Sequence, residues 1–266
     1  MIAVRASRLA FPGIALLLFA GSVAATVAWC AAMPDGMAGI PMPGGWSMSM
    51  AWLPLCGRSW AGTAASFLGM WTVMMVAMML PVLVPMLRRY RQAVDGAGMT
   101  AAGLGRLTML AGLAYFCVWI LVGVAVFPLG AVLATTMPVL PVLARAMPAA
   151  GGVIVLIAGI SQFTAWKARQ LACCRRGHVG CDRLPADAGT AWRHGLRLGL
   201  HCVRCCAGPT AVLLVTGVMD PIAMLVVALA IAAERLAPDG ESMARITGAL
   251  AVGAGFFLIV RAIALS

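Results

Sequence analysis

Charged side chains are scarce in this 266-residue chain, which has eight Asp and Glu residues, three His residues and 10% charged residues overall. A soluble domain carries about 25% charged residues, so the composition departs from that of a soluble protein. The sequence also has no P-loop, no glycine-rich nucleotide-binding pattern, no HExxH motif and no Ser/His/Asp candidate. These absences argue against a hydrolase and an ATP-driven pump, and no enzyme activity is predicted.

Hydrophobic residues, by contrast, make up 63% of the chain, and its mean hydropathy is +1.00. They form long continuous runs and do not alternate with polar residues. A membrane-spanning helix needs about 20 mostly apolar residues, and only helices or closed barrels satisfy the backbone in lipid. The sequence therefore predicts an all-α, polytopic membrane helix bundle that forms a single transmembrane domain over residues 1–266.

Seven spanning helices are expected. They cover about residues 9–32, 64–87, 107–133, 149–166, 198–217, 222–236 and 245–264. The first follows Arg5 and Arg8 in the manner of a signal peptide, but its apolar run exceeds the usual 7–15 residues. We therefore expect an uncleaved first helix.

The distribution of basic residues predicts the orientation of the chain. With the N-terminus in the cytoplasm, most of the 19 Lys and Arg residues lie beside inner segments, and only Arg58, Arg145 and Arg261 lie beside outer ones. Basic residues are retained on the cytoplasmic side of membrane proteins. The net charge of +11 is thus explained by topology and not by a nucleic-acid partner. We expect a bacterial inner-membrane protein with its C-terminus outside.

Two predicted loops have unusual compositions. The outer loop, about 33–63, is rich in Met, Gly, Pro and Trp, whereas the inner loop, about 167–197, is basic. The inner loop also carries Cys and His residues, namely Cys173, Cys174, His178, Cys181 and His194.

The segment His201-Cys202-Val203-Arg204-Cys205-Cys206 is the strongest candidate metal site. Residues three or four apart share a helix face, which places Cys202 over Cys205 and Cys206, and His201 over Cys205. Thiolates suit Cu(I) and Zn, and imidazole suits Zn and Cu. Cu(I) is the favoured ion and Zn is the alternative. The preceding loop offers further candidate ligands, chiefly Cys174 and Cys173.

The same cysteines allow two other interpretations. Cysteine is often a small buried hydrophobic residue, so the cluster could be inert packing. It could also be a redox-active dithiol. A permanent disulfide is disfavoured, because the predicted location faces the cytosol, where thiols are kept reduced.

Arg204 is predicted to lie within a span, where a charge is costly and is usually paired. Arg204 and Glu234 lie at similar distances from the turn at Asp220, roughly 24 and 21 Å at about 1.5 Å per residue. We therefore expect these two residues to form a structural ion pair. In an alternative role, Arg204 would lower the pKa of the nearby thiols.

Methionines suggest a weaker path for the metal. Met70, Met74 and Met78 form a stripe at four-residue spacing, and Met48 and Met50 lie in the outer loop between tryptophans. Thioethers are soft ligands that suit Cu(I). Flexible core packing is the other interpretation of the stripe, and a segment at the lipid headgroups is the other interpretation of the loop.

Four motifs spread over most of the chain match the pattern of one protein family. They are Trp71…Met74…Ala77-Met78-Met79-Leu80-Pro81…Pro85; Gly159…Gln162…Thr164…Lys167, followed by Cys174-Arg175; Cys202…Cys205-Cys206; and Gly217-Val218-Met219…Met224…Glu234-Arg235. In these motifs the chain resembles a bacterial family of uncharacterised integral membrane proteins that are predicted to bind metal and carry a CxxCC element. The resemblance implies a metal-related role in a membrane.

The chain departs from that family pattern at four places. Gln170 stands where the family usually has Cys, Leu198 where it has His, Arg204 where it has Gly and Asp220 where it has Asn. His201 and Cys173 are the candidates to replace the missing His and Cys.

The sequence thus predicts a membrane protein that handles a soft metal for transport or delivery. Its expected partners are the lipid bilayer and either a metallochaperone or a larger membrane complex. One rival is a scaffold subunit whose glycines, Gly248, Gly253 and Gly255, pack against other chains. The other rival is a membrane thiol-disulfide oxidoreductase.

Overall fold

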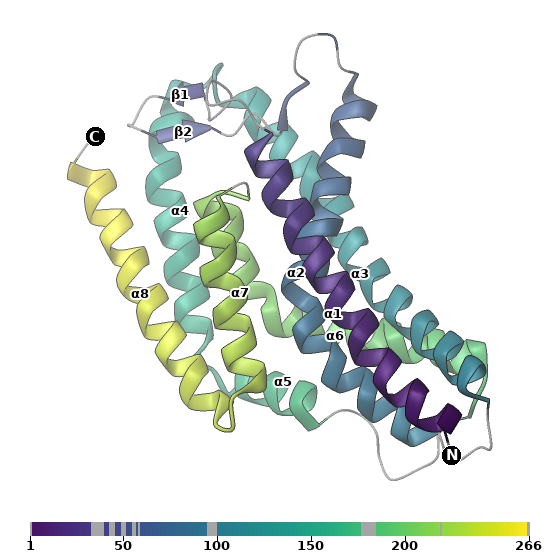
Figure 1. Cartoon of the computed structure of the whole chain (residues 1–266). Helices are drawn as coiled ribbons and strands as arrows, with labels where there is room; N and C mark the ends of the chain where they lie inside the picture. Colours follow the sequence, from purple (N-terminus) through teal and green to yellow (C-terminus); the bar gives the residue numbers. More distant parts are fainter. Residues whose placement is uncertain are drawn as a thin grey trace.

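The computed structural model describes residues 2–32, 40–42, 46–48, 52–54, 57, 59–94, 100–176, 185–218 and 220–264, without the side chains of 2–10, 40–42, 47–48 and 173–176. Its elements are α1 (Ile2–Ala31), β1 (Ile40–Met42), β2 (Trp46–Met48), α2 (Trp60–Val94), α3 (Ala101–Thr136), α4 (Pro141–Ser161), α5 (Ala165–Arg176), α6 (Ala188–Thr216), α7 (Pro221–Leu236) and α8 (Gly240–Ala264) (Figure 1).

The predicted all-helical membrane fold is confirmed. Six helices in the described part of the chain are long and apolar enough to span a membrane: α1 from Phe11, α2, α3, α4, α6 and α8. Large apolar side chains such as Leu17 and Val142 are 74% and 81% exposed, as expected for a lipid-facing surface. Helix α7 has 16 residues, which is shorter than the usual span of about 20. The count of seven spans therefore stays a prediction.

The two ends of the bundle differ in character (Figure 1). The β1–β2 hairpin and the C-terminus lie at one end, which we call the hairpin end. The N-terminus, α5 and the last turns of α2 with Arg88, Arg89 and Arg91 lie at the other, which we call the basic end. This distribution of charge agrees with the predicted cytoplasmic N-terminus, which stays a prediction.

The predicted inner loop, about 167–197, is largely helical, contrary to expectation. Helix α5 occupies its first part, and α6 begins at Ala188, about three turns before the predicted start. Asp187 caps α6, because its Oδ1 accepts a hydrogen bond from the backbone N–H of Thr190 at 2.8 Å. Basic and polar residues interrupt every apolar run in this stretch, so its helicity was hidden from a search for long hydrophobic runs.

The outer loop contains a short hairpin that was not predicted. Strands β1 and β2 pair antiparallel, with Ile40 opposite Met48 and Met42 opposite Trp46. The Trp46 indole N–H donates a hydrogen bond of 2.9 Å to the backbone oxygen of Ala144 in α4. Pro148, four residues further on, has no N–H for that oxygen. The tryptophan thus satisfies a backbone group that a proline leaves open and ties the hairpin to α4.

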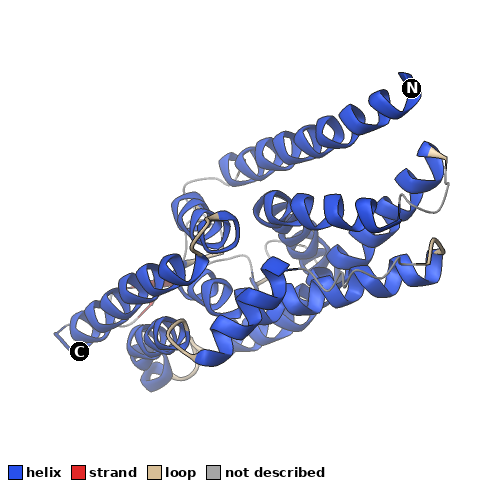
Figure 2. Cartoon of the chain, turned by 90° about the horizontal axis from the view of Figure 1, so that it is seen from below, coloured by secondary structure: helices blue, strands red, loops and turns tan. Residues whose placement is uncertain are grey.

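Helix α2 contributes more residues to the described hydrophobic core than any other helix, and α1, which begins at the N-terminus, lies at the edge of the bundle (Figure 2). Trp71 of α2 is fully buried and donates from its indole nitrogen to the backbone oxygen of Trp119 in α3, at 2.9 Å. A Cβ atom on Gly123 would lie 2.6 Å from the Trp71 ring, so glycine is needed there for α2 and α3 to pack this closely.

Glycines also bring α4 and α8 together. A Cβ atom on Gly159 would lie 2.9 Å from the backbone oxygen of Gly248, and one on Gly152 would lie 3.1 Å from that of Gly255. Close approach through small residues is the usual way in which helices pack in membranes. Gly248 and Gly255, proposed above as a surface for other chains, are thus used within this chain, whereas Gly253 has no atom within 4 Å of a Cβ position.

Candidate metal centre

Three sulfur atoms from two helices meet in the interior of the bundle. The Cys202 and Cys206 Sγ atoms of α6 are 3.9 Å apart, and the Cys202 Sγ atom is 3.9 Å from the Sδ atom of Met79 in α2. All three side chains are at most 2% exposed. Cys202 and Cys206 are four residues apart and therefore share one helix face, as the sequence predicted.

Helix α6 packs against α3 in its first half and against α4 towards its end, and the thiols lie between these two contacts. In its first half, a Cβ atom on Gly195 would lie 2.2 Å from the backbone oxygen of Ala111 in α3. Towards its end, Val215 contacts α4 at Gly151. Cys202 lies between these contacts, and its Sγ atom accepts a hydrogen bond of 2.8 Å from the buried hydroxyl of Tyr115 in α3.

A buried arginine of α7 adds positive charge beside the thiols. The Arg235 Nη2 atom lies 3.5 Å from the Cys206 Sγ atom, and the residue is 7% exposed. The positive charge of this side chain therefore lies next to the sulfur atoms of the cluster.

Lys167, the only lysine of the chain, holds the helix that carries the cysteines. Pro209 has no N–H to donate to the backbone oxygen of Cys205, four residues earlier in α6. The Lys167 Nζ atom donates to that oxygen at 2.7 Å. A break in the helical hydrogen bonding next to the thiols is thus closed by a side chain from α5.

Lys167 also forms a buried ion pair with Glu234 of α7, with 2.8 Å between Nζ and Oε2. The other carboxylate oxygen of Glu234 accepts hydrogen bonds from the Gln162 amide at 2.8 Å and the Thr247 hydroxyl at 2.7 Å. The network joins residues of α5, α7 and α8 and the end of α4 around one carboxylate. Such a network is needed because an unpaired carboxylate is costly to bury.

The predicted ion pair between Arg204 and Glu234 is wrong. Arg204 is exposed, because positions two residues from Cys202 and Cys206 point to the opposite side of α6. The estimate of depth along the α6–α7 hairpin ignored the rotation of the side chain around the helix. It also treated Lys167 as a loop residue, so the actual partner of Glu234 was not considered.

Residues 68–258 match the model of the PpoB2 family, which is described as a copper chaperone family. The chain belongs to this family. No curated protein and no solved structure matches the chain. The family match gives the chain a copper-handling role and agrees with the predicted metal-related family. The residues of the sulfur cluster and of the Lys167 network all lie within the matched segment.

The sulfur cluster is chemically suited to the metal of this copper chaperone family. Bonds between a transition metal and cysteine sulfur are about 2.3 Å long, so one ion can bridge sulfurs up to roughly 4.6 Å apart. The observed separations of 3.9 Å fall within that limit. Soft thiolate and thioether ligands select Cu(I). Among the described residues, no group of three or more His, Cys, Asp and Glu is arranged to hold a metal.

The other predicted ligands have different positions. Cys205 is 2% exposed and next to Cys206, whereas His201 is only half-buried. The side chains of Cys173 and Cys174 lie outside the described part of the structure, as do His178 and Cys181. Met50 and the Met48 side chain lie outside it too. For these residues the predicted metal role stays a prediction.

The predicted methionine stripe is buried in the core, but the methionine that contacts the thiols is not one of its members. Met70, Met74 and Met78 are 1%, 1% and 6% exposed. The thioether at the cluster belongs to Met79, which shares its helix face with Met75. Spacing alone predicted Met70, Met74 and Met78, which lie on the face of α2 next to the one that carries Met79.

Sequence reasoning missed four residues around the cluster, namely Met79, Tyr115, Lys167 and Arg235. Three of them, all except Tyr115, belong to the motifs on which the family resemblance rests. That resemblance was the signal that could have found them. Nothing in the sequence distinguished Tyr115.

Proposed function

We propose that this chain binds Cu(I) inside the membrane, with Cys202 and Cys206 of α6 and Met79 of α2 as ligands, and delivers it to a partner. The observation that carries the proposal is the convergence of three buried sulfur atoms, with both measured separations at 3.9 Å. Two thiolates and a thioether form a soft ligand set that suits Cu(I).

The buried methionines of α2 supply a route to this site. Met70, Met74, Met75 and Met79 follow one another along α2, which runs from the hairpin end towards the basic end. Ions would enter from the methionines of the outer loop, Met48 and Met50. Weak thioether ligands then allow the ion to move on, and the thiols at Cys202 and Cys206 hold it more tightly.

Delivery would occur at the basic end, where the cysteines of α5 lie. Cys173 and Cys174 would receive the ion from the buried cluster and present it to a metallochaperone or membrane complex. Cys205 is the third thiol of the motif and takes part in the transfer. Zn remains the alternative ion for any site that His201 completes together with these residues.

Metal content measured by mass spectrometry tests the proposal. The full chain, purified in detergent under reducing conditions and loaded with Cu(I), should retain about one copper per chain. The double variant Cys202→Ser/Cys206→Ser should retain at least tenfold less. Cys117→Ser is the matched control, because Cys117 of α3 is a free, half-buried thiol outside the cluster, and it should bind like the wild type.

Metal content, together with the redox state of the thiols, separates the proposal from its rivals. Absence of copper in the wild type and both variants would contradict it and favour a scaffold subunit. A disulfide between Cys202 and Cys206 that forms and is reduced during turnover with a thiol substrate, without metal, would favour an oxidoreductase.

A further inference from the structure

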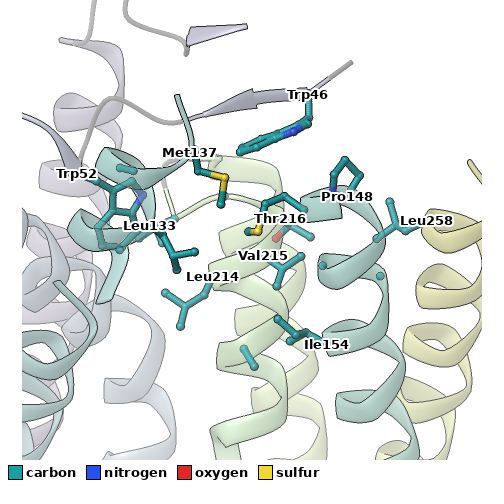
Figure 3. Close-up of a pocket in the computed structure, with 18 of the residues that line it drawn as sticks. Trp46, Trp52, Leu133, Met137, Pro148, Ile154, Leu214, Val215, Thr216 and Leu258 are labelled. Carbon is teal, nitrogen blue, oxygen red and sulfur yellow. The ribbon is translucent and has the colours of Figure 1, made fainter. Parts of the chain in front are cut away.

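A cavity of about 810 Å³ lies at the hairpin end of the bundle (Figure 3). Its walls come from α3, α4, α6 and α8, and Trp46 and Trp52 lie on its outer side. Known ligand pockets range from about 300 to 1,000 Å³, so the cavity is large enough for an organic ligand. Ala211, the wall residue of α6 nearest in sequence to Cys206, lies about 7.5 Å along the helix from it, and no residue of the sulfur cluster lines the cavity.

The interior of the cavity is apolar. Most of its lining is aliphatic, with Leu133, Met137 and Leu214 among the residues that face it. The polar groups of two lining residues are already used, because Trp46 donates to Ala144 and the Thr216 hydroxyl donates to the backbone oxygen of Val212 at 3.0 Å. Most of the exposed wall is apolar, and buried water is held chiefly by polar groups. The cavity is therefore suited to a hydrocarbon chain.

The cavity has a positively charged side chain at its edge. Of the described residues that line it, Arg261 of α8 alone is charged, and it is exposed. Neither described carboxylate that forms an ion pair, Glu234 or Glu241, is its partner. An apolar chamber with a cation at its edge complements an amphiphile that has an acyl chain and an anionic headgroup.

The cavity also extends to the surface that faces lipid. Its lining residues Leu129 of α3 and Ile154 of α4 are 64% and 42% exposed, so the cavity is open and not sealed. An acyl chain of a membrane lipid can therefore reach it from the bilayer. The tryptophans lie at the same end, as expected for residues at the level of the lipid headgroups.

We propose that this cavity binds an anionic phospholipid, with an acyl chain between α3, α4 and α6 and the phosphate at Arg261. The lipid would fill the space between helices that glycine contacts do not close. This site is independent of the copper proposal, since it uses none of the same residues.

Native mass spectrometry of the full chain tests the lipid site. The protein is given phosphatidylglycerol, phosphatidylethanolamine and oleate at equal concentrations, and the mass of each adduct identifies what is bound. The wild type should retain one phosphatidylglycerol in preference to the other two. Arg261→Gln should lose about fivefold of that preference, the contribution of one basic residue near an anionic lipid. Arg145→Gln, an exposed arginine outside the cavity, is the matched control and should bind like the wild type.

A second pair of variants tests the chain-binding part of the cavity. Ile154→Trp fills the cavity from its wall and should reduce retention of all three amphiphiles. Ile157→Trp is one turn away on the exposed face of α4, does not line the cavity and should have no effect. The proposal would be overturned if the wild type and Arg261→Gln each retained phosphatidylglycerol and phosphatidylethanolamine equally. So would an adduct of oleate alone, or equal effects of the two tryptophans.

Discussion

At the scale of single residues, side chains from distant segments donate hydrogen bonds to backbone oxygens that prolines leave without a helical partner. Pro148 and Pro209 each remove one helical N–H, and Trp46 and Lys167 donate to the carbonyl oxygens that are left. In both cases a side chain from a distant segment completes a helix. The prolines therefore tie the hairpin to α4 and α5 to α6.

The Lys167–Glu234 ion pair should matter far more for stability than a surface pair. Lys167→Met leaves the Glu234 carboxylate buried without its cation, and breaking a buried pair costs about 3–5 kcal/mol. Arg245→Met breaks the exposed pair with Glu241 and should cost less than about 1 kcal/mol. Chemical unfolding in detergent measures both values. Similar losses in the two variants would show that Lys167 has no special structural role.

Sequence patterns predicted the thiols of this site better than their surroundings. The four-residue spacing of Cys202 and Cys206 fixes a shared helix face whatever the fold, so their contact was predictable. The partners from other helices, Met79 and Tyr115, depend on how helices rotate and cross. No local pattern encodes that rotation, which is also why the Arg204–Glu234 pair was wrong.

At the scale of elements, glycine positions decide which helices touch. Gly159→Ala should separate α4 from α8, because the new Cβ atom would lie 2.7 Å from the backbone nitrogen of Val252. Gly253→Ala is the matched control, with nothing within 4 Å, and should stabilise α8 by up to about 1 kcal/mol. The thermal midpoints of the two variants should thus move in opposite directions. A Gly159→Ala protein as stable as the control would contradict this packing.

The cap of α6 should depend on pH. Hydrogen bonds from Thr190 lower the pKa of the Asp187 carboxyl below its usual range. A lowered pKa stabilises the folded state above the unfolded value of about 3.9, and this contribution is lost as pH falls through the folded value. Asp187→Ala should therefore lower the thermal midpoint at pH 6 and have a smaller effect near pH 3. An effect that is larger at pH 3 would refute this assignment.

Helix boundaries were predictable only where apolar runs coincide with helices. The span from 222 to 236 corresponds closely to α7, since Asp220 and Pro221 mark its start in the sequence. Helix α5 and the start of α6 are polar and basic, and they were predicted as a loop. Hydrophobicity reports contact with lipid, so it cannot detect helical segments that are rich in polar and basic residues.

At the scale of the whole molecule, the termini lie at opposite ends of the bundle (Figure 1). With the basic end in the cytoplasm, the C-terminus lies outside. A C-terminal fusion to alkaline phosphatase, which is active only outside the cytoplasm, should show high activity. A fusion to a fluorescent protein that folds only inside should be dark. The reverse result would overturn the predicted orientation.

The account as a whole depends on copper at the buried sulfur atoms. X-ray absorption spectroscopy of the full chain loaded with Cu(I) tests this most directly, because it reports both oxidation state and neighbouring atoms. The account predicts a monovalent edge and a first shell of sulfur at about 2.3 Å. The sulfur shell should lose one neighbour in Met79→Leu and be abolished in Cys202→Ser/Cys206→Ser. A shell of nitrogen or oxygen, or a sulfur shell unchanged in these variants, would contradict the proposed site.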